Sequence, residues 1–170
     1  MIIKAFPLKL ELNWGEDAKL RKIKIELNLN SGEPLFILDK KEEKKLFKKF
    51  WTAFLEYWNF KTAFVDVEHH IKLTEFEKRV LEETRKIPPG EVITYKELAE
   101  RIGCPRGYRA VGRALARNPL PLVYPCHRVI ATSGYGGYTG GLVLKYFLLL
   151  REKLKDNFFA YLSKFRQELS

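Results

Sequence analysis

Residues 94–119 read TYKELAERIGCPRGYRAVGRALARNP, and this stretch carries the strongest local signals of the fold. Thr94 is a good N-cap for a short helix that we expect to run to Ile102. A turn should follow at residues 103–105, and then a second helix over about 106–117. Pro119 should stop this helix, because the residue before a proline disfavours the helical conformation. Two short helices joined by a tight turn with a glycine predict a helix-turn-helix.

The second helix of this pair is expected to have one cationic face and one apolar face. At about 100° per residue, four arginines share an arc of about 80°: Arg106, Arg109, Arg113 and Arg117. Another arc is apolar and holds Val111, Ala114 and Leu115. Small residues border the cationic face, namely Gly107, Ala110 and Gly112. A solvated surface helix and a helix that binds nucleic acid both fit the arginines, and the small residues favour a close approach to a groove.

Downstream of this motif, residues 125–129 read PCHRV and place one of only two cysteines beside one of only three histidines. An imidazole can lower the pKa of a thiol or take its proton, which makes the cysteine a nucleophile. The segment from Arg101 to Arg151 contains several arginines and a lysine but no Asp or Glu. A nucleophile in this positively charged segment would be suited to an anionic substrate. The alternative is a buried core cysteine beside a hydrogen-bonded histidine.

The geometry of this pair depends on the local backbone. We expect residues 120–124 to be extended, and neighbouring side chains on a strand point to opposite faces. Cys126 and His127 can therefore cooperate only if the chain turns there or if a water links them.

The composition is that of a basic globular protein. The 170 residues are 46% hydrophobic and carry a formal net charge of +10. After residue 72 the chain has 17 Lys/Arg and 10 Asp/Glu, against 14 and 11 before it. Such a concentration of basic residues indicates a polyanionic partner, most often nucleic acid. The sequence shows no signal peptide and no apolar run long enough for a bilayer, so we expect a cytoplasmic protein without a membrane partner.

Two domains are expected, the first over residues 1–70 and the second over 71–170. Alternating apolar residues predict strands in the first, and a helical aromatic stripe predicts a helix. Its expected elements are strands over 2–12 and 20–29, a turn at 31–34, a strand at 35–38, a helix capped by Asp39 with its stripe over 46–58, and a return to the sheet at 64–67.

The second domain is expected to be mostly helical. Thr74 and Glu77 have the spacing of a capping box, which predicts a helix that ends at residues 87–90. Beyond the helix-turn-helix and the PCHRV run, the expected elements are a glycine-rich loop over 132–141 and helices over about 143–153 and 156–167.

Together these motifs resemble the O(6)-alkylguanine-DNA alkyltransferases, which repair methylated guanine by taking the alkyl group onto a cysteine. The resemblance covers residues 74–152. It is carried by PCHRV and by Thr94-Tyr95, Arg109-Ala110-Val111-Gly112, Arg117-Asn118-Pro119, Pro121, and Tyr138 followed by Gly140-Gly141-Leu142. It implies an α+β fold, with a small ribonuclease H-like sheet-and-helix domain before a mainly helical, winged-helix-like domain.

The resemblance also implies residue roles. Cys126 would accept the alkyl group, His127 would act as its base through a water, and Glu152 would hold the imidazole. Asn118 would be the hinge between the helix-turn-helix and the site. For DNA binding, the implied set is Arg109 as the finger that replaces the flipped base, Tyr95 against the phosphate backbone, Gly107, Ala110 and Gly112 against the minor groove, and Arg106, Arg113 and Arg128. The implied base pocket consists of Pro121, Tyr138, Thr139 and Gly136.

The implied activity is an irreversible transfer from O(6)-alkylguanine, and also from O(4)-alkylthymine, after the nucleotide is flipped through the minor groove. Each molecule would react once. The implied partner is double-stranded DNA carrying the alkylated base, bound by a monomer without a cofactor. Some relatives bind structural zinc through N-terminal cysteines and histidines, but residues 1–72 hold no cysteine and only His69 and His70. We therefore expect no metal site.

Three alternatives remain at this point. An alkyltransferase-like protein would bind the lesion without repairing it, although those relatives lack the acceptor cysteine. A helix-turn-helix regulator would bind one sequence, usually as a dimer at spaced half-sites. A cysteine hydrolase would need an oxyanion hole and would turn over.

Overall fold

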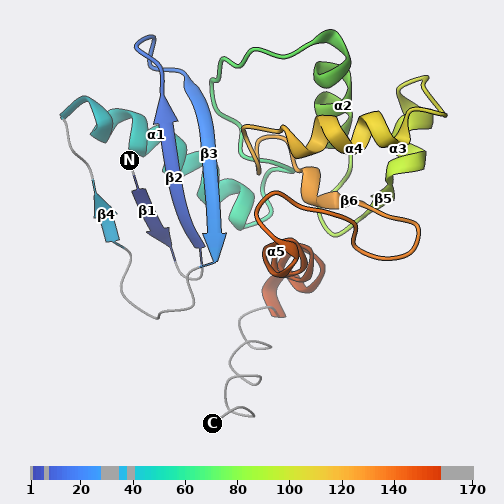
Figure 1. Cartoon of the computed structure of the whole chain (residues 1–170). Coiled ribbons are helices and arrows are strands. Elements are labelled where there is room, and N and C mark those ends of the chain that lie inside the picture. The colour runs from blue at the N-terminus through green and yellow to red at the C-terminus, as the bar shows by residue number, and fades with distance from the viewer. Residues whose placement is uncertain (1, 6–7, 28–34, 38–40, 158–170) are drawn as a thin grey trace.

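The computed structural model describes residues 2–5, 8–27, 35–37 and 41–157, which are coloured in Figure 1. It has two parts side by side: a sheet with one long helix, and a group of shorter helices (Figure 1). The predicted turn at 31–34, the cap at Asp39 and the part of the helix over 156–167 that follows Asn157 lie outside the described residues.

The described sheet is antiparallel, with four strands in the order β3-β2-β1-β4. Its strands are β1 (Ile2–Ala5), β2 (Leu8–Trp14), β3 (Leu20–Leu27) and β4 (Leu35–Ile37). Leu10 lies opposite Ile25, and Leu12 lies opposite Ile23. Because side chains alternate along a strand, these apolar residues share one face of the sheet. The strands predicted from the alternation are confirmed in β2 and β3, but the described residues of the stretch 2–12 form two strands, β1 and β2, which pair with each other in antiparallel fashion.

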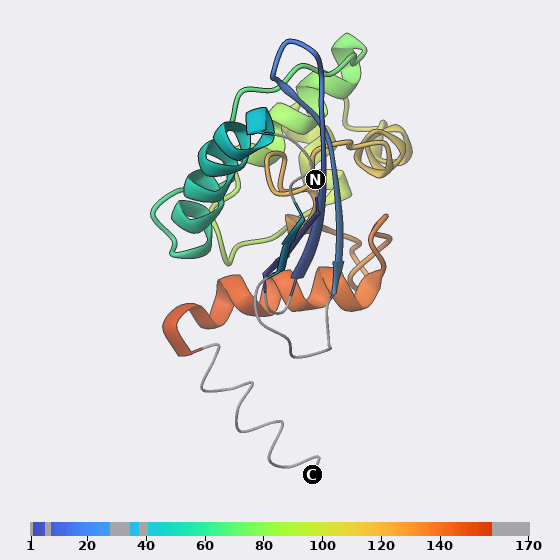
Figure 2. The same cartoon turned by 90° about the vertical axis from the view of Figure 1, so that its left-hand side faces the viewer.

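Helix α1, Lys41–Trp58, covers that face of the sheet (Figure 2). Phe50 and Phe54 are 0% and 2% exposed, and their stacked ring centroids lie 6.2 Å apart. Burying a side chain of this size stabilises the fold by about 1.5–3 kcal/mol relative to leaving it in water. The predicted aromatic stripe is therefore the helix side of the N-terminal core.

The predicted return to the sheet at residues 64–67 is wrong, because these residues form no strand; the segment meets the sheet further on, where His69 bridges Leu20 of β3 in parallel. Val65 donates its backbone N–H to the carbonyl oxygen of Leu122 at 2.9 Å instead of pairing with a strand. At the edge of β3, the N–H of Ile23 donates to the carbonyl oxygen of Pro119 at 2.8 Å. These two bonds join loops of the helical part to the sheet and to the segment after α1.

Capping boxes begin two helices of the C-terminal part. The helices are α2 (Glu75–Arg85), α3 (Tyr95–Arg101) and α4 (Tyr108–Ala116). Thr74 and Glu77 cap α2 reciprocally, as predicted, and Thr94 caps α3. Glu97 completes a second box at α3, which its position three residues after Thr94 could have revealed.

The helix-turn-helix is confirmed, with one correction at the start of its second helix. Helices α3 and α4 pack together across the turn that links them. However, α4 begins at Tyr108 with Gly107 as its N-cap, so Arg106 lies in the turn and not on the helical arc. A glycine offers no side-chain cap, which is why the helix start could not be placed from a capping residue.

Residues 120–124 form turns, and the prediction of an extended segment is wrong. Leu122 is fully buried and has a φ of 75°, a left-handed conformation that bulky residues rarely adopt. The chain then forms a short 3₁₀ helix, η1, over Cys126–Arg128, followed by β6 (Val129–Ile130), which pairs in parallel with β5 (Ile93–Thr94). Because the chain turns at Cys126, adjacent side chains there are not forced to opposite faces.

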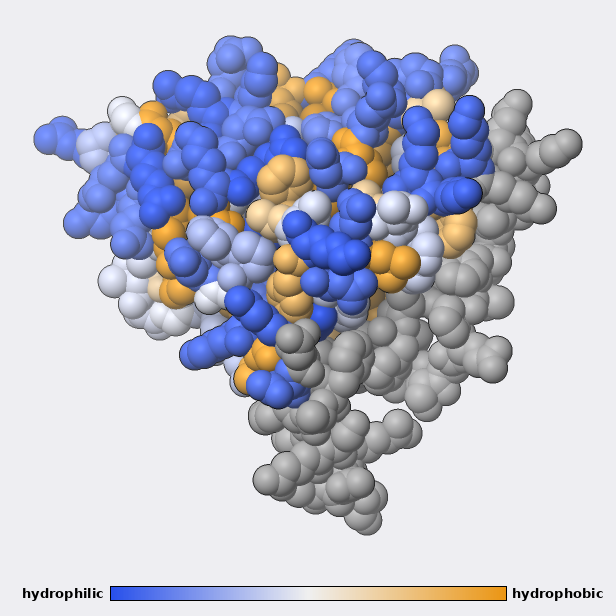
Figure 3. All heavy atoms as spheres, turned by 180° about the vertical axis from the view of Figure 1, so that it is seen from behind, coloured by the Kyte–Doolittle hydropathy of each residue, from blue (hydrophilic) through white to orange (hydrophobic). Residues whose placement is uncertain are grey.

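The described part of the chain ends with α5 (Leu142–Leu154) and the 3₁₀ turn η2 (Lys155–Asn157). Helix α5 crosses beneath one end of the sheet (Figure 2). The face seen in Figure 3 is mostly hydrophilic, with its hydrophobic side chains in separate patches. No helix among the described residues is long and apolar enough to cross a membrane.

Candidate active site

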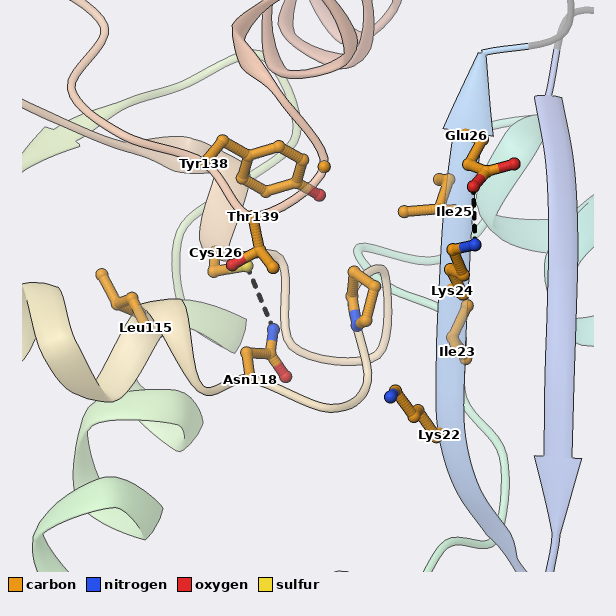
Figure 4. Close-up of a pocket in the computed structure, with 12 residues that line it drawn as sticks. Lys22, Ile23, Lys24, Ile25, Glu26, Leu115, Asn118, Cys126, Tyr138 and Thr139 are labelled. Carbon is orange, nitrogen blue, oxygen red and sulfur yellow. Dashed lines mark hydrogen bonds and ion pairs between the residues drawn. The ribbon is translucent and has the colours of Figure 1, made fainter.

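The thiol of Cys126 lies at the start of η1, and only 8% of the residue is exposed. Asn118 follows the helix-turn-helix and donates from Nδ2 to Cys126 Sγ at 3.1 Å (Figure 4). The same amide donates to the carbonyl oxygen of Tyr124 at 2.8 Å, and its Oδ1 accepts from the N–H of Leu120 at 3.0 Å. Asn118 therefore fixes the turn that presents the thiol and can stabilise negative charge on the sulfur.

His127 and Glu152 meet in the interior next to this thiol. His127 Nε2 lies 2.9 Å from Glu152 Oε1, and the two residues are 0% and 1% exposed. A carboxylate only accepts, so Nε2 carries the proton and Nδ1 is the accepting nitrogen of the neutral ring. Nδ1 has no hydrogen-bond partner within the described part of the protein. The arrangement provides a buried base whose accepting nitrogen is not engaged by a described side chain.

The electrostatics of this pair suit a base. Burial lowers the pKa of His127, and the charge of Glu152 only partly opposes that effect. Burial by itself would raise the pKa of Glu152, but the charges and hydrogen bonds of His127 and Arg128 lower it below the usual range. At neutral pH the pair therefore consists of a neutral imidazole and a carboxylate, as general-base catalysis requires.

Arg128 does not face DNA, which corrects its place in the predicted DNA-binding set. The residue is 0% exposed. Its Nε donates to Glu152 Oε2 at 3.0 Å and its Nη2 to Glu152 Oε1 at 2.7 Å. Its Nη1 donates to the carbonyl oxygen of Ile87 at 2.7 Å, and its Nη2 also donates to the carbonyl oxygen of Ala63 at 2.6 Å. The segment around Arg128 lacks acids, but its counter-charge comes from α5.

Lys145, on α5, is a site residue that the sequence did not single out beyond its charge. Its buried Nζ donates to the carbonyl oxygens of Val129 and Tyr135 at 2.6 Å and 2.5 Å, and to that of Gly137 at 3.3 Å. Burial lowers its pKa to about 8. A lone lysine within the apolar stretch LVLKYFLLL is the signal that could have found it. Lys145 holds the glycine-rich loop against the site.

The thiol itself is neutral at rest. Burial raises the pKa of Cys126, against the hydrogen bond from Asn118 and the charge of Lys145, which both lower it. The site therefore stores a thiol and supplies the groups that stabilise a thiolate when the proton is taken.

Two cavities meet at Cys126. The larger, of about 380 Å³, lies between the thiol and β3, and residues from both parts of the chain point into it (Figure 4). The smaller, of about 260 Å³, extends toward α3 and α4 and is lined by Tyr95 and Gly112 among others. Tyr138 and Thr139, predicted for the base pocket, line both cavities, and Pro121 lines the larger one.

Tyr138 has the properties of a hydrogen-bond donor to a bound base. Its hydroxyl is buried without a partner among the described residues. Burial raises the pKa of Tyr138 well above its ordinary value, so the hydroxyl keeps its proton. A flat ring with a protonated hydroxyl at a cavity wall can both stack on a base and donate to it.

Two of the predicted glycines have other reasons to be small. Gly136 lines neither cavity; it has a φ of 67°, and a Cβ there would lie 2.8 Å from Tyr95 Cε2. A Cβ on Gly107 would lie 2.6 Å from Cys104 Sγ, so the close packing inside the turn already requires a glycine there. The position of Gly136 outside both cavities argues against its predicted base-pocket role, whereas the minor-groove role of Gly107 stays a prediction.

The remaining candidates for DNA contact lie on or near α4. Arg106, Arg109 and Arg113 are exposed, while Ala110 and Gly112 are half-buried. Tyr95, the first residue of α3, is half-buried, and its hydroxyl donates to the carbonyl oxygen of Gly137 at 3.3 Å. An exposed cationic surface thus lies on the helix that also borders the smaller cavity.

Comparisons with known proteins find relatives that match the part of the chain that holds this site. The family model described as "6-O-methylguanine DNA methyltransferase, DNA binding domain" matches residues 75–154. The methylated-DNA–protein-cysteine methyltransferase of Methanosarcina barkeri is 44% identical over 117 residues, which are 68% of this chain and 72% of the relative. The protein of the same name from Metallosphaera sedula is 47% identical over 89 residues, which are 52% of this chain and 56% of the relative.

Solved structures show the same similarity. Mycobacterium tuberculosis OGT, in a crystal structure in complex with DNA, gives a TM-score of 0.69 at 32% identity over 86% of this chain and 88% of that one. The O6-methylguanine-DNA methyltransferase of Pyrococcus kodakaraensis gives a TM-score of 0.54 at 25% identity, over 85% of this chain and 91% of that one.

Proposed function

This chain belongs to the O6-methylguanine DNA methyltransferase family, the methylated-DNA–protein-cysteine methyltransferases, and we propose that Cys126 is the residue onto which it transfers the alkyl group. The observation that carries this proposal is a buried thiol with a hydrogen-bond donor on its sulfur and, at the next residue, a buried histidine paired with a carboxylate. Asn118 donates to Cys126 Sγ, and His127 donates to Glu152 with its other nitrogen free to accept. Catalysis of a thiol displacement needs these groups and little water.

The reaction proceeds as a displacement at the alkyl carbon. His127 takes the thiol proton through a water, and the sulfur electron pair forms a bond to the alkyl carbon. The bond from that carbon to the guanine oxygen breaks, and its electrons leave with the base. The proton taken from the thiol is delivered to the base, which becomes an unmodified guanine still attached to its nucleotide in the DNA, and Cys126 remains as a thioether. A thioether has no leaving group for hydrolysis, so each molecule reacts once.

The target base must leave the duplex before it can reach a buried thiol. An alkylated guanine is stacked and paired, so the protein has to flip the nucleotide into a pocket. The exposed arginines of α4 supply phosphate contacts, which give affinity without sequence preference, and Arg109 fills the space that the base leaves. We assign the flipped base to the cavities at Cys126, with Tyr138 as a donor to it. Double-stranded DNA carrying O(6)-alkylguanine, and also O(4)-alkylthymine, is the proposed partner.

Intact-mass measurement tests the assignment of the acceptor. After incubation with duplex DNA containing O(6)-methylguanine, the native chain should gain one methyl group, located on the peptide that contains Cys126. Cys126→Ala should gain none. Cys104→Ala, which removes the other free cysteine, is the matched control and should still gain one. An unchanged mass of the native chain under saturating DNA would refute the transfer, and DNA binding without it would indicate an alkyltransferase-like protein.

The role of His127 is tested separately from DNA binding. His127→Ala should slow single-turnover transfer by about 10²–10⁴-fold, the usual contribution of a general base. The affinity for DNA should stay within about twofold, because His127 is buried and touches no phosphate. Rapid-quench kinetics and a fluorescence titration measure the two quantities. Equal transfer rates in the variant and the native protein would contradict the relay.

A further inference from the structure

The carboxylate of Glu152 is held by more donors than its partnership with His127 requires. Oε1 accepts from His127 Nε2 at 2.9 Å, from Arg128 Nη2 at 2.7 Å and from Tyr57 Oη at 3.0 Å. Oε2 accepts from Arg128 Nε at 3.0 Å and from the N–H of Gly90 at 3.2 Å. Arg128 already neutralises the charge, so the Tyr57 hydroxyl is an additional donor on the oxygen that orients the histidine.

Tyr57 reaches this oxygen from the other part of the chain. It lies in the last turn of α1, 95 residues before Glu152, and is 4% exposed. The other recorded donors to the carboxylate come from residues 90–128. Burial raises the pKa of Tyr57 well above its ordinary value, and the charge of Glu152 adds to this effect. The hydroxyl therefore stays protonated and acts only as a donor here.

A donor on Oε1 changes how strongly Glu152 attracts a proton on His127. Each hydrogen bond to a carboxylate spreads its charge, so the imidazolium that would form at His127 is stabilised less. The other charged or titratable groups that act on His127 are Glu152 and Lys145 from α5, and Arg128 from η1. Both cations disfavour the imidazolium, and the phenol acts in the same direction by weakening the one anion.

We propose that Tyr57 is a positioning residue through which the N-terminal sheet-and-helix unit sets the basicity of His127. The hydroxyl fixes Oε1 and withdraws charge from it, so that the histidine remains a neutral base at physiological pH. The proposal rests on the proposed function only in naming His127 as the base. The contact and its effect on the imidazole belong to the free protein and can be measured without DNA.

A histidine titration by NMR tests the proposal directly. The chain has three histidines, so the imidazole signals of His127 can be assigned by comparison with His127→Ala. In Tyr57→Phe the pKa of His127 should rise by about 0.5–1 unit, because the carboxylate loses one donor. His70, which is exposed, serves as the internal reference. An unchanged His127 pKa in a folded Tyr57→Phe protein would overturn the proposal.

Tyr124→Phe is the matched control. It removes another buried tyrosine hydroxyl, one that lies 2.8 Å from His69 Nε2 and donates to Glu82 at 3.3 Å without touching Glu152. The pKa of His127 should not change in this variant. A rise equal to that in Tyr57→Phe would show a general effect of losing a buried hydroxyl and would also overturn the proposal.

The pH dependence of transfer gives a second readout. The rate should fall at low pH as His127 becomes protonated, and in Tyr57→Phe this acid limb should move up by the same amount as the titration. At high pH the two rates should converge. A uniform loss of rate at every pH would indicate a merely structural role. A native protein that transfers nothing refutes the proposed function, and the titration still decides the role of Tyr57.

A further measurement covers the case in which Tyr57→Phe does not fold. The native sequence can be produced with fluorotyrosine, whose more acidic hydroxyl is a stronger donor. The pKa of His127 should then fall below that of the unlabelled protein. No change, or a rise, would count against the proposal.

Discussion

At the scale of single residues, Arg128 and Arg113 contrast a structural arginine with one that is proposed to bind DNA. Arg128 is buried on Glu152, whereas Arg113 is exposed on α4. Arg128→Met should cost about 3–5 kcal/mol of unfolding free energy, because it leaves Glu152 as an uncompensated buried charge. Arg113→Met should leave stability within about 0.5 kcal/mol and weaken DNA binding, with a shallower salt dependence.

Urea unfolding and salt-dependent DNA titrations measure these two effects. Both variants replace an arginine with a methionine, so any difference between them reflects where the arginine lies and not the kind of substitution. Weaker DNA binding by a stable Arg128→Met protein would restore Arg128 to the DNA-binding face.

Glu152 also makes stability depend on pH. Its folded pKa is lowered from the ordinary 4.5, so the unfolded chain takes up this proton at a higher pH than the folded one does. Its stabilising contribution is therefore complete above the unfolded pKa and is lost as the pH falls from about 5 toward the lowered folded value. In Glu152→Gln the unfolding free energy should be lower at pH 7 and should fall less steeply with acid. A series of urea unfolding curves between pH 7 and pH 3 tests this, and equal slopes would exclude the effect.

At the scale of elements, the turn of the helix-turn-helix depends on the contact between Gly107 and Cys104. A Cβ on Gly107 would lie 2.6 Å from Cys104 Sγ and 3.0 Å from its carbonyl oxygen. Gly107→Ala should therefore destabilise the protein by about 1–3 kcal/mol through crowding. Adding Cys104→Ala should recover part of the loss, because the sulfur is removed while the carbonyl remains. Thermal unfolding of both variants measures the coupling, and strictly additive effects would contradict it.

Helix beginnings were predictable where a side chain marks them. Thr74 with Glu77 and Thr94 at the start of α3 are visible in the sequence, because a cap is a local contact three residues long. The start of α4 at Tyr108 was missed, since its N-cap is a glycine. The turns over 120–124 were also missed, because the sequence does not show that Leu122 is held in a left-handed conformation by its tertiary contacts.

Like the helix beginnings, the candidate site could be predicted from the sequence only in part. The roles of Cys126, His127, Asn118 and Glu152 are implied by the family resemblance, and the hydrogen bonds of Asn118 with Cys126 and of His127 with Glu152 agree with those roles. Burial is not written in a local pattern, so Arg128 was assigned to the DNA-binding face. The contact of Tyr57 with Glu152 joins residues in different parts of the fold, and no spacing predicts it.

At the scale of the whole molecule, the N-terminal part completes the site. Tyr57 and the carbonyl oxygen of Ala63 satisfy Glu152 and Arg128, and β3 forms a wall of the larger cavity. A chain of residues 71–170, cut at the expected domain boundary, would leave these buried groups without their partners. Each unsatisfied buried group costs about 1–3 kcal/mol. The truncated chain should unfold at lower temperature and transfer more slowly per folded molecule.

Calorimetry and single-turnover transfer measure these changes. Adding residues 1–70 as a separate chain is the control for a missing partner surface. Native stability and native rate in the truncated chain would show that the helical part is sufficient.

The burial of Cys126 affects how long a protein molecule that has not yet reacted stays active. Under the proposed function each molecule reacts once, so any other electrophile that modifies Cys126 inactivates the protein. Because the thiol is 8% exposed and burial raises its pKa, the free protein offers small electrophiles little thiolate and little access. Under the proposed function, the sulfur is thereby kept for the alkyl group of a base that is flipped into the cavity.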